Sequence, residues 1–99
     1  MPYVKQEKRR TLDPIIDDLI TALRGMQLDD PTDNIQGNVN YVITRLLDKL
    51  YNANYQEVNN GVGMMMCALL EYYRRMAGPY EDQKAFENGD AYEHTIAPK

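Results

Sequence analysis

Residues 61–70 of this 99-residue chain read GVGMMMCALL and contain no charged or amide side chain. The rest of the chain is polar and acidic, with a formal net charge of −4 at pH 7. A helix that is apolar on every side has to be covered on every side. A chain of this length has few other elements with which to cover one, so the run predicts contact with a second copy of the protein.

Apolar side chains recur at the spacing of a helix in three segments, the last of which contains this run. Polar capping residues, glycine and proline mark the ends of these segments and predict three helices. The first spans about residues 11–25, the second begins between residues 34 and 38 and runs to about 50, and the third spans about 54–78. The three apolar stripes are Leu12, Ile15, Ile16, Leu19, Ile20 and Leu23; Val39, Val42, Ile43, Leu46, Leu47 and Leu50; and Tyr55, Val58, Val62, Met65, Met66, Leu69, Tyr73 and Met76.

Together these helices predict an all-α fold, a three-helix antiparallel bundle that forms one helical domain over residues 11–78. A basic N-terminal arm, residues 1–10, is expected to be extended, and an acidic C-terminal tail, residues 79–99, to be irregular. A domain of this size buries only roughly 65% of its unfolded surface, so self-association would add useful stability. We therefore expect a homo-oligomer.

Composition and charge exclude several classes of protein. The negative net charge argues against a general nucleic-acid binder, which normally has a basic excess or a basic face. Cys67 is the only cysteine, and its place in the apolar run predicts a buried thiol in a reducing compartment. The run is too short to span a bilayer, and no apolar signal region is found near the N-terminus. These features predict a cytoplasmic protein without membrane association.

The face of the second helix opposite its apolar stripe carries a candidate binding patch. At about 100° per residue, Tyr41 and Arg45 point away from the stripe and are i, i+4 neighbours. An aromatic ring stacks on a planar base, and a guanidinium group pairs with phosphate. The third helix offers a similar pair on its outer face. The predicted ligand-binding residues are Asn38, Tyr41, Thr44, Arg45, Tyr72 and Arg75.

The outer face of the third helix also predicts where a second copy docks. Small residues there would let another helix approach closely, and Met64 would be exposed unless something covered it. The predicted interface residues are Gly61, Met64, Cys67 and Ala68. Two plainer interpretations stay open. Tyr41 and Arg45 can form an ordinary subunit contact, and the methionine run can be adaptable core.

Signals for catalysis are weak. The only histidine, His94, lies in the polar tail, and the apolar surroundings of Cys67 favour an inert thiol over a nucleophile. Some all-helical nucleotide hydrolases bind magnesium through carboxylates, but their repeated Glu-x-x-Glu pattern is absent here. We therefore predict no catalytic residue, no metal and no cofactor. The carboxylates that a hydrolase would use are Asp17 and Asp18 with Asp48 or Glu71.

Several short blocks give the sequence a resemblance to a known family. They are Met1-Pro2-Tyr3, residues 40–46 (NYVITRL), Tyr73-Arg74-Arg75, residues 79–82 (PYED), and residues 87–90 (ENGD) with Tyr92. The chain resembles a family of short uncharacterised proteins found in bacteriophages and bacteria. The resemblance spans most of the chain and brings no established chemistry.

A phage context suggests a protein that acts by binding. Small phage proteins include helical homo-oligomers that sequester the nucleotide messengers of bacterial immunity, and this analogy fits the aromatic and arginine side chains described above. The leading prediction is a non-enzymatic homo-oligomer of the host cytoplasm that sequesters an anionic small molecule, in particular a nucleotide immune signal. The alternatives are a protein-interaction module that inhibits a host protein through its acidic surface and tail, and a metal-dependent nucleotide hydrolase.

Overall fold

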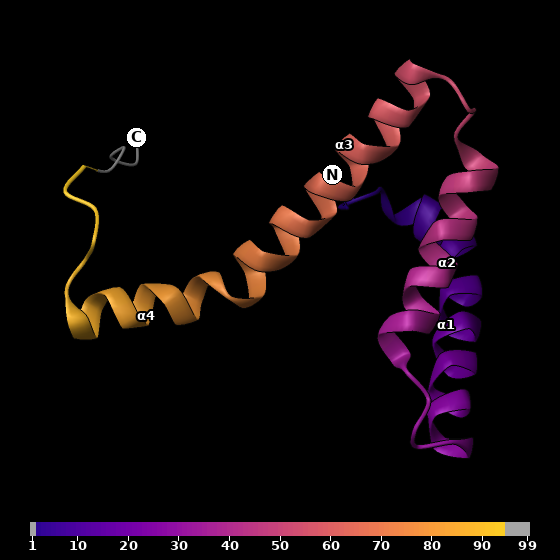
Figure 1. The fold of residues 1–99 in the computed structure, drawn as a ribbon, viewed down its shortest axis with the longest axis horizontal. Helices are drawn as coiled ribbons and strands as arrows, with labels where there is room; N and C mark the ends of the chain where they lie inside the picture. The colour runs from indigo at the N-terminus through magenta and orange to yellow at the C-terminus, as the bar shows by residue number, and fades with distance from the viewer. Residues whose placement is uncertain (1, 95–99) are drawn as a thin grey trace. The chain divides into compact units, whose positions relative to one another are not determined.

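A computed structural model describes residues 2–94 of the chain. Over these residues it is all-helical, with four helices and no strand: α1 (Gln6–Asp29), α2 (Ile35–Leu50), α3 (Tyr55–Met76) and α4 (Gly78–Asn88) (Figure 1). The chain divides into two compact units, Met1–Gly63 and Met64–Lys99. The first unit contains α1, α2 and the start of α3, and the second contains the rest of α3 and α4. The all-α prediction is confirmed, and the three-helix bundle is wrong.

The N-terminal helix is longer than its apolar stripe. Lys5 is the extended N-cap of α1, and its carbonyl accepts hydrogen bonds from the backbone N–H groups of Lys8 and Arg9 at 3.0 and 3.3 Å. The Nε of Arg9 donates to the carbonyl of Val4 at 2.9 Å. The predicted extended arm is therefore helical from Gln6 onward. Residues 6–10 are good helix formers without apolar periodicity, so the stripe alone could not reveal them.

In the first unit, α1 and α2 lie side by side and are joined by a short polar turn (Figure 1). The carboxylate of Asp30 accepts hydrogen bonds from the hydroxyl and the backbone N–H of Thr32, at 2.6 and 3.0 Å. These two bonds, that from the hydroxyl above all, hold the pKa of Asp30 below its ordinary value. Asn34 then caps α2 by accepting from the N–H of Gly37 at 3.2 Å.

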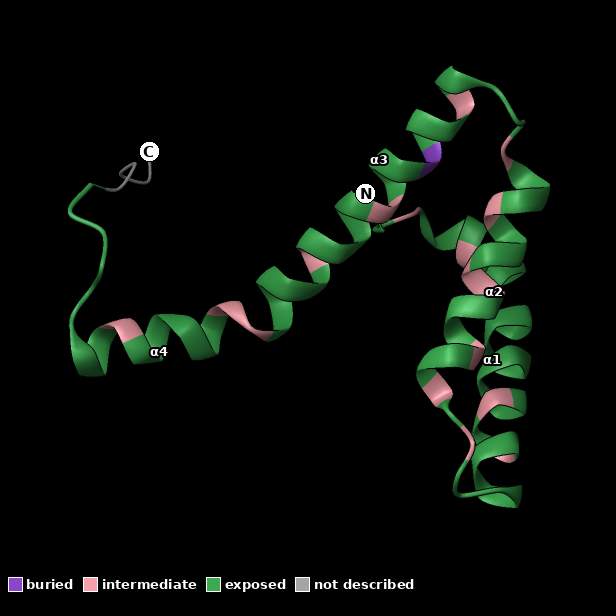
Figure 2. Ribbon diagram, viewed as in Figure 1, coloured by how far each residue is buried: buried purple, intermediate pink, exposed green. Residues whose placement is uncertain are grey.

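A glycine lies where the start of α3 meets the end of α2. Asn54 caps the start of α3, because its side chain accepts a hydrogen bond from the N–H of Glu57 at 2.9 Å. Two turns later, Gly61 is the one buried residue among those described (Figure 2). A Cβ atom at this position would lie 3.3 Å from Cδ2 of Leu47 and 3.6 Å from Cγ of Tyr51. Gly61 therefore packs against the side chains of Leu47 and Tyr51 at the end of α2.

In the second unit, the predicted irregular tail contains a helix. Pro79 occupies the first turn of α4, where the missing N–H of proline costs no helical hydrogen bond. The N–H of Ala77 still donates to Tyr73 at 2.8 Å, and the carbonyl of Ala77 accepts from Glu81 at 2.9 Å. Gly78 and Pro79 thus end one helix and begin the next, which gives the described chain four helices where the sequence predicts three.

The apolar stripes remain largely open to solvent. No hydrophobic side chain among the described residues is fully buried. Ile15 of α1 is 65% exposed, and Leu69 of α3 is 59% exposed. These stripes have the pattern of packed helices but lack the cover that packed helices have. None of the helices described is both long and apolar enough to cross a membrane.

Candidate functional site

Two of the predicted ligand-binding residues, Tyr41 and Arg45, contact one another on α2. The two residues lie one turn apart, and Nη1 of Arg45 donates a hydrogen bond to the hydroxyl of Tyr41 at 3.2 Å. The Cζ atom of Arg45 lies 6.0 Å from the ring centroid, at the outer limit of a cation–π contact. The guanidinium is therefore held mainly by the hydroxyl end of the ring. Tyr41 remains 62% exposed, so the ring can still receive a stacking partner.

The electrostatics of this pair favour a permanent cation. The hydrogen bond to Tyr41, followed by the charge of Tyr41 and that of Asp48, raises the pKa of Arg45 above its ordinary value. In the described part of the chain Arg45 forms no salt bridge. Because a guanidinium carries five N–H donors and only one is used here, the others are available to an anion or a base.

Two of the predicted ligand-binding residues, Asn38 and Thr44, already form hydrogen bonds within the chain. The amide nitrogen of Asn38 donates to Oδ2 of Asp33 at 2.6 Å and ties the α1–α2 turn to α2. The hydroxyl of Thr44 lies 2.8 Å from the carbonyl oxygen of Asn40, to which it donates. Asn38 is half-buried, and its hydrogen bond is structural. These two residues therefore have less capacity to recognise a ligand than their positions predict.

Tyr72 and Arg75 belong to the second unit, whereas Tyr41 and Arg45 belong to the first. They lie three residues apart near the end of α3, and Tyr72 is exposed. Beside them, Arg74 donates from Nη2 to Oε1 of Glu71 at 2.6 Å. Glu71, a candidate metal ligand of the hydrolase alternative, is thus paired with an arginine.

The predicted oligomer interface also divides between the units. Gly61 lies in the first unit, against Leu47 and Tyr51 of its own chain. Met64, Cys67 and Ala68 lie in the second unit and are exposed. Cys67, predicted to be buried, is therefore open to solvent within the chain. Cover by a second copy remains a prediction for these three residues.

The carboxylates do not assemble a metal site in the part of the chain that the structure describes. No group of three histidine, cysteine, aspartate or glutamate side chains there is placed to hold an ion. Asp17 and Asp18 lie exposed on α1, and His94 is exposed after the end of α4. Arg9, from the predicted basic arm, makes its contact with the backbone at Val4.

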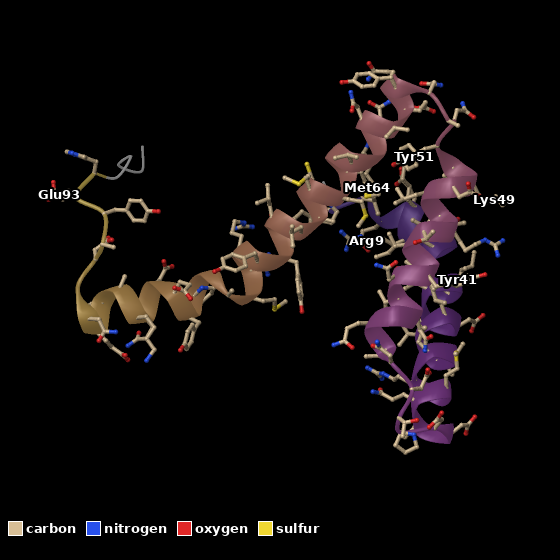
Figure 3. The ribbon with its side chains drawn as sticks, in the orientation of Figure 1. Arg9, Tyr41, Lys49, Tyr51, Met64 and Glu93 are labelled. Atoms are coloured by element: carbon tan, nitrogen blue, oxygen red, sulfur yellow. The ribbon has the colours of Figure 1, made fainter. Side chains whose placement is uncertain are left out.

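Lys49 is a further charged residue of α2 that was not among the predicted site residues; Figure 3 labels it together with Tyr41 on this helix. It lies four residues after Arg45 on α2 and is exposed. The i, i+4 spacing could have identified it, since this is the spacing that links Tyr41 to Arg45. We refer to Tyr41, Arg45, Asp48 and Lys49 as the α2 outer face.

Comparison with known proteins places the chain in a family. A family model described as a domain of unknown function (DUF6899) matches residues 1–91. The chain therefore belongs to the DUF6899 family, which confirms the resemblance to an uncharacterised family; a phage or bacterial source stays a prediction. Searches of curated proteins and of solved structures give no match.

Proposed function

We propose that this DUF6899 protein is a homo-oligomeric binding protein that sequesters an anionic small molecule, with a nucleotide as the ligand and without catalysis. The observation that carries the proposal is the Tyr41–Arg45 pair, an exposed ring whose hydroxyl holds a guanidinium in place. Nucleotides combine a flat aromatic base with negative phosphate. A tyrosine ring and an arginine fork are the side chains that match these two features.

The exposed apolar stripes support the oligomeric part of the proposal. Large contiguous apolar patches are uncommon on monomeric soluble proteins and mark surfaces that contact another molecule. In the second unit, α3 exposes Met66, Leu69 and Leu70, whose spacing of three and four residues places them on one side of the helix. A second copy would cover such a stripe.

The family resemblance supports the proposed context. A nucleotide messenger of bacterial immunity would be the ligand if the source is a bacteriophage, and the host cytoplasm would be the place of action. Sequestration needs only binding, which fits a site that offers stacking and ionic contacts. Under this proposal the protein lowers the free concentration of the messenger and so opposes defence.

Calorimetry and native mass spectrometry with a panel of cyclic and linear nucleotides test the proposal. The purified full-length chain should bind at least one of them, and the Tyr41→Ala/Arg45→Ala double variant should lose at least tenfold in affinity. A matched control exists on α4, where Nζ of Lys84 lies 5.6 Å from the ring centroid of Tyr80. The Tyr80→Ala/Lys84→Ala variant removes the same kinds of group and should bind normally. If no nucleotide binds to correctly assembled protein, the proposal is wrong.

A second candidate function rests on α4. This acidic helix exposes Phe86 at 86% and also exposes Tyr80, a combination of charge and aromatic surface that suits protein recognition. Truncation after Gly78 separates the two functions. Loss of binding to a host protein with nucleotide binding intact would favour a protein-interaction module, whereas retained host binding would contradict it.

A further inference from the structure

The sequence contains two Asn-Gly pairs, Asn60-Gly61 in α3 and Asn88-Gly89 at the end of α4. In such a pair the side-chain amide of the asparagine can react with the backbone nitrogen of the glycine. Glycine has no Cβ atom to obstruct this approach, so it is the most permissive residue to follow an asparagine. The fold decides whether the glycine N–H and the asparagine side chain of each pair are free to react.

The Asn60-Gly61 pair is held in an unreactive arrangement. Both residues lie inside α3, where the N–H of Gly61 belongs to the helical hydrogen-bond ladder. The side-chain amide of Asn60 accepts a hydrogen bond from Nε2 of Gln56 and donates one to Oε2 of Glu57, both at 3.0 Å. Gly61 is also buried. A reaction at this pair therefore requires α3 to open locally first.

The Asn88-Gly89 pair lacks these restraints. Both residues are exposed, as is the described chain that follows them (Figure 2). The residues that follow α1, α2 and α3 still donate their N–H groups to their own helix, whereas Gly89 shows no hydrogen bond to any described residue. The N–H of Tyr92 donates to Oδ1 of Asp90 at 2.8 Å, so it does not hold the carbonyl of Asn88 in a further helical turn. The ψ angle of Asn88 can therefore leave its helical value without the loss of a hydrogen bond within the described chain.

We propose that Asn88 is a site of spontaneous deamidation and that the fold protects Asn60 from the same reaction. The backbone nitrogen of Gly89 attacks Cγ of Asn88, and a C–N bond forms between them. The bond from Cγ to the side-chain nitrogen breaks, and that nitrogen leaves as ammonia together with the proton of the Gly89 N–H. Water then opens the cyclic imide at either carbonyl, which yields aspartate or isoaspartate. Water is the only co-reactant.

The product adds a negative charge at an unfavourable position of α4. The C-terminal end of a helix is the negative end of its dipole, and the last turn of α4 contains Glu87 but no basic residue. Isoaspartate also inserts a methylene group into the backbone. Deamidation should therefore unwind the last turn of α4 and change the charge of the acidic helix on which the second candidate function rests. The inference is independent of nucleotide binding.

Peptide mapping by tandem mass spectrometry tests the proposal on full-length protein aged in a mildly alkaline buffer. In the folded protein, deamidation at Asn88 should be at least about tenfold faster than at Asn60, because only Asn60 has to wait for a helix to open. Isoaspartate should form at Asn88, since the cyclic imide opens at either carbonyl. In guanidinium chloride the two rates should become similar, because both pairs are then unfolded. Equal rates in the folded protein, faster reaction at Asn60, or aspartate as the sole product would overturn the proposal.

Matched variants connect the reaction to its residue. Ageing of the unmodified chain should produce an acidic form on ion-exchange chromatography, and Asn88→Gln should abolish that form because glutamine would have to close a larger ring. Asn60→Gln makes the same change at another exposed position and should leave the rate of its formation unchanged. Circular dichroism of the fresh proteins checks that both variants fold. An acidic form that persists in Asn88→Gln would contradict the assignment.

Discussion

Gly61 on α3 lies against Leu47 and Tyr51 of α2, and it illustrates what a single residue decides in this protein. Its small size in the apolar run predicts close approach by a second copy. The structure uses the same small size inside the chain, to bring α3 up to α2. Sequence shows that a close helix contact is made at a glycine, but it does not show which helix makes the contact.

The glycines of α3 provide a matched pair for testing this contact. A Cβ at Gly63 would meet nothing within 4 Å, whereas one at Gly61 would lie 3.3 Å from Leu47. Gly61→Leu should therefore be less stable than Gly63→Leu by about 1–3 kcal/mol, because only the first overpacks a tight contact. Urea unfolding of both variants measures the difference. Equal stabilities would show that α2 and α3 do not pack at Gly61.

The sequence predicts the contact between Tyr41 and Arg45 but not the hydrogen bond between Asn38 and Asp33. Tyr41 and Arg45 were found because their contact depends only on helical spacing, and the hydrogen bond between them fits that spacing. The hydrogen bond that Asn38 donates to Asp33 could not be predicted in this way. Its partner, Asp33, lies in the turn before α2, and the geometry of that turn is not encoded in a helical period.

At the scale of elements, periodicity predicted helices where an apolar stripe is present and missed helical turns where it is absent. The predicted helix over residues 54–78 is α3, which spans Tyr55–Met76. The first turn of α1 and the whole of α4 lack a regular apolar stripe, so the sequence does not predict them as helical. Pro79 predicts the end of a helix, but proline is equally compatible with the first turn of a new one.

A single proline substitution tests whether residues 78–88 form a helix or an irregular tail. Ala85→Pro places proline inside the helix, where it removes a hydrogen bond and clashes with the preceding turn at a cost of about 3 kcal/mol. Helical ellipticity should fall, and backbone chemical shifts over Gly78–Asn88 should move toward coil values. Ala91→Pro lies beyond the helix and is the control. If both variants keep the same ellipticity, α4 is not formed in solution.

At the scale of the whole molecule, the exposed apolar side chains favour association with other copies. Each unit, taken by itself, leaves apolar side chains uncovered, with Ile15 an example in the first and Leu69 in the second. Small domains are marginal even when they bury a full core. Association of copies is the proposed means by which this chain gains the burial that it lacks.

Met64 tests that association. It is 42% exposed in the chain and lies in the apolar run, so Met64→Glu would place a charge in the proposed interface. The variant should dissociate at micromolar concentration, as measured by light scattering and native mass spectrometry. Asn59→Glu introduces the same side chain at an exposed polar position of α3 and should assemble normally. An intact oligomer in Met64→Glu would show that this part of α3 is not the interface.

The exposed position of Cys67 gives the protein a natural chemical reporter. It is the only thiol in the chain, so a thiol-directed reagent labels one site in every copy without any mutation. The labelling rate measures how much of the time this stretch of α3 is uncovered. Followed against protein concentration, and with and without nucleotide, that rate can show whether assembly and ligand binding are coupled.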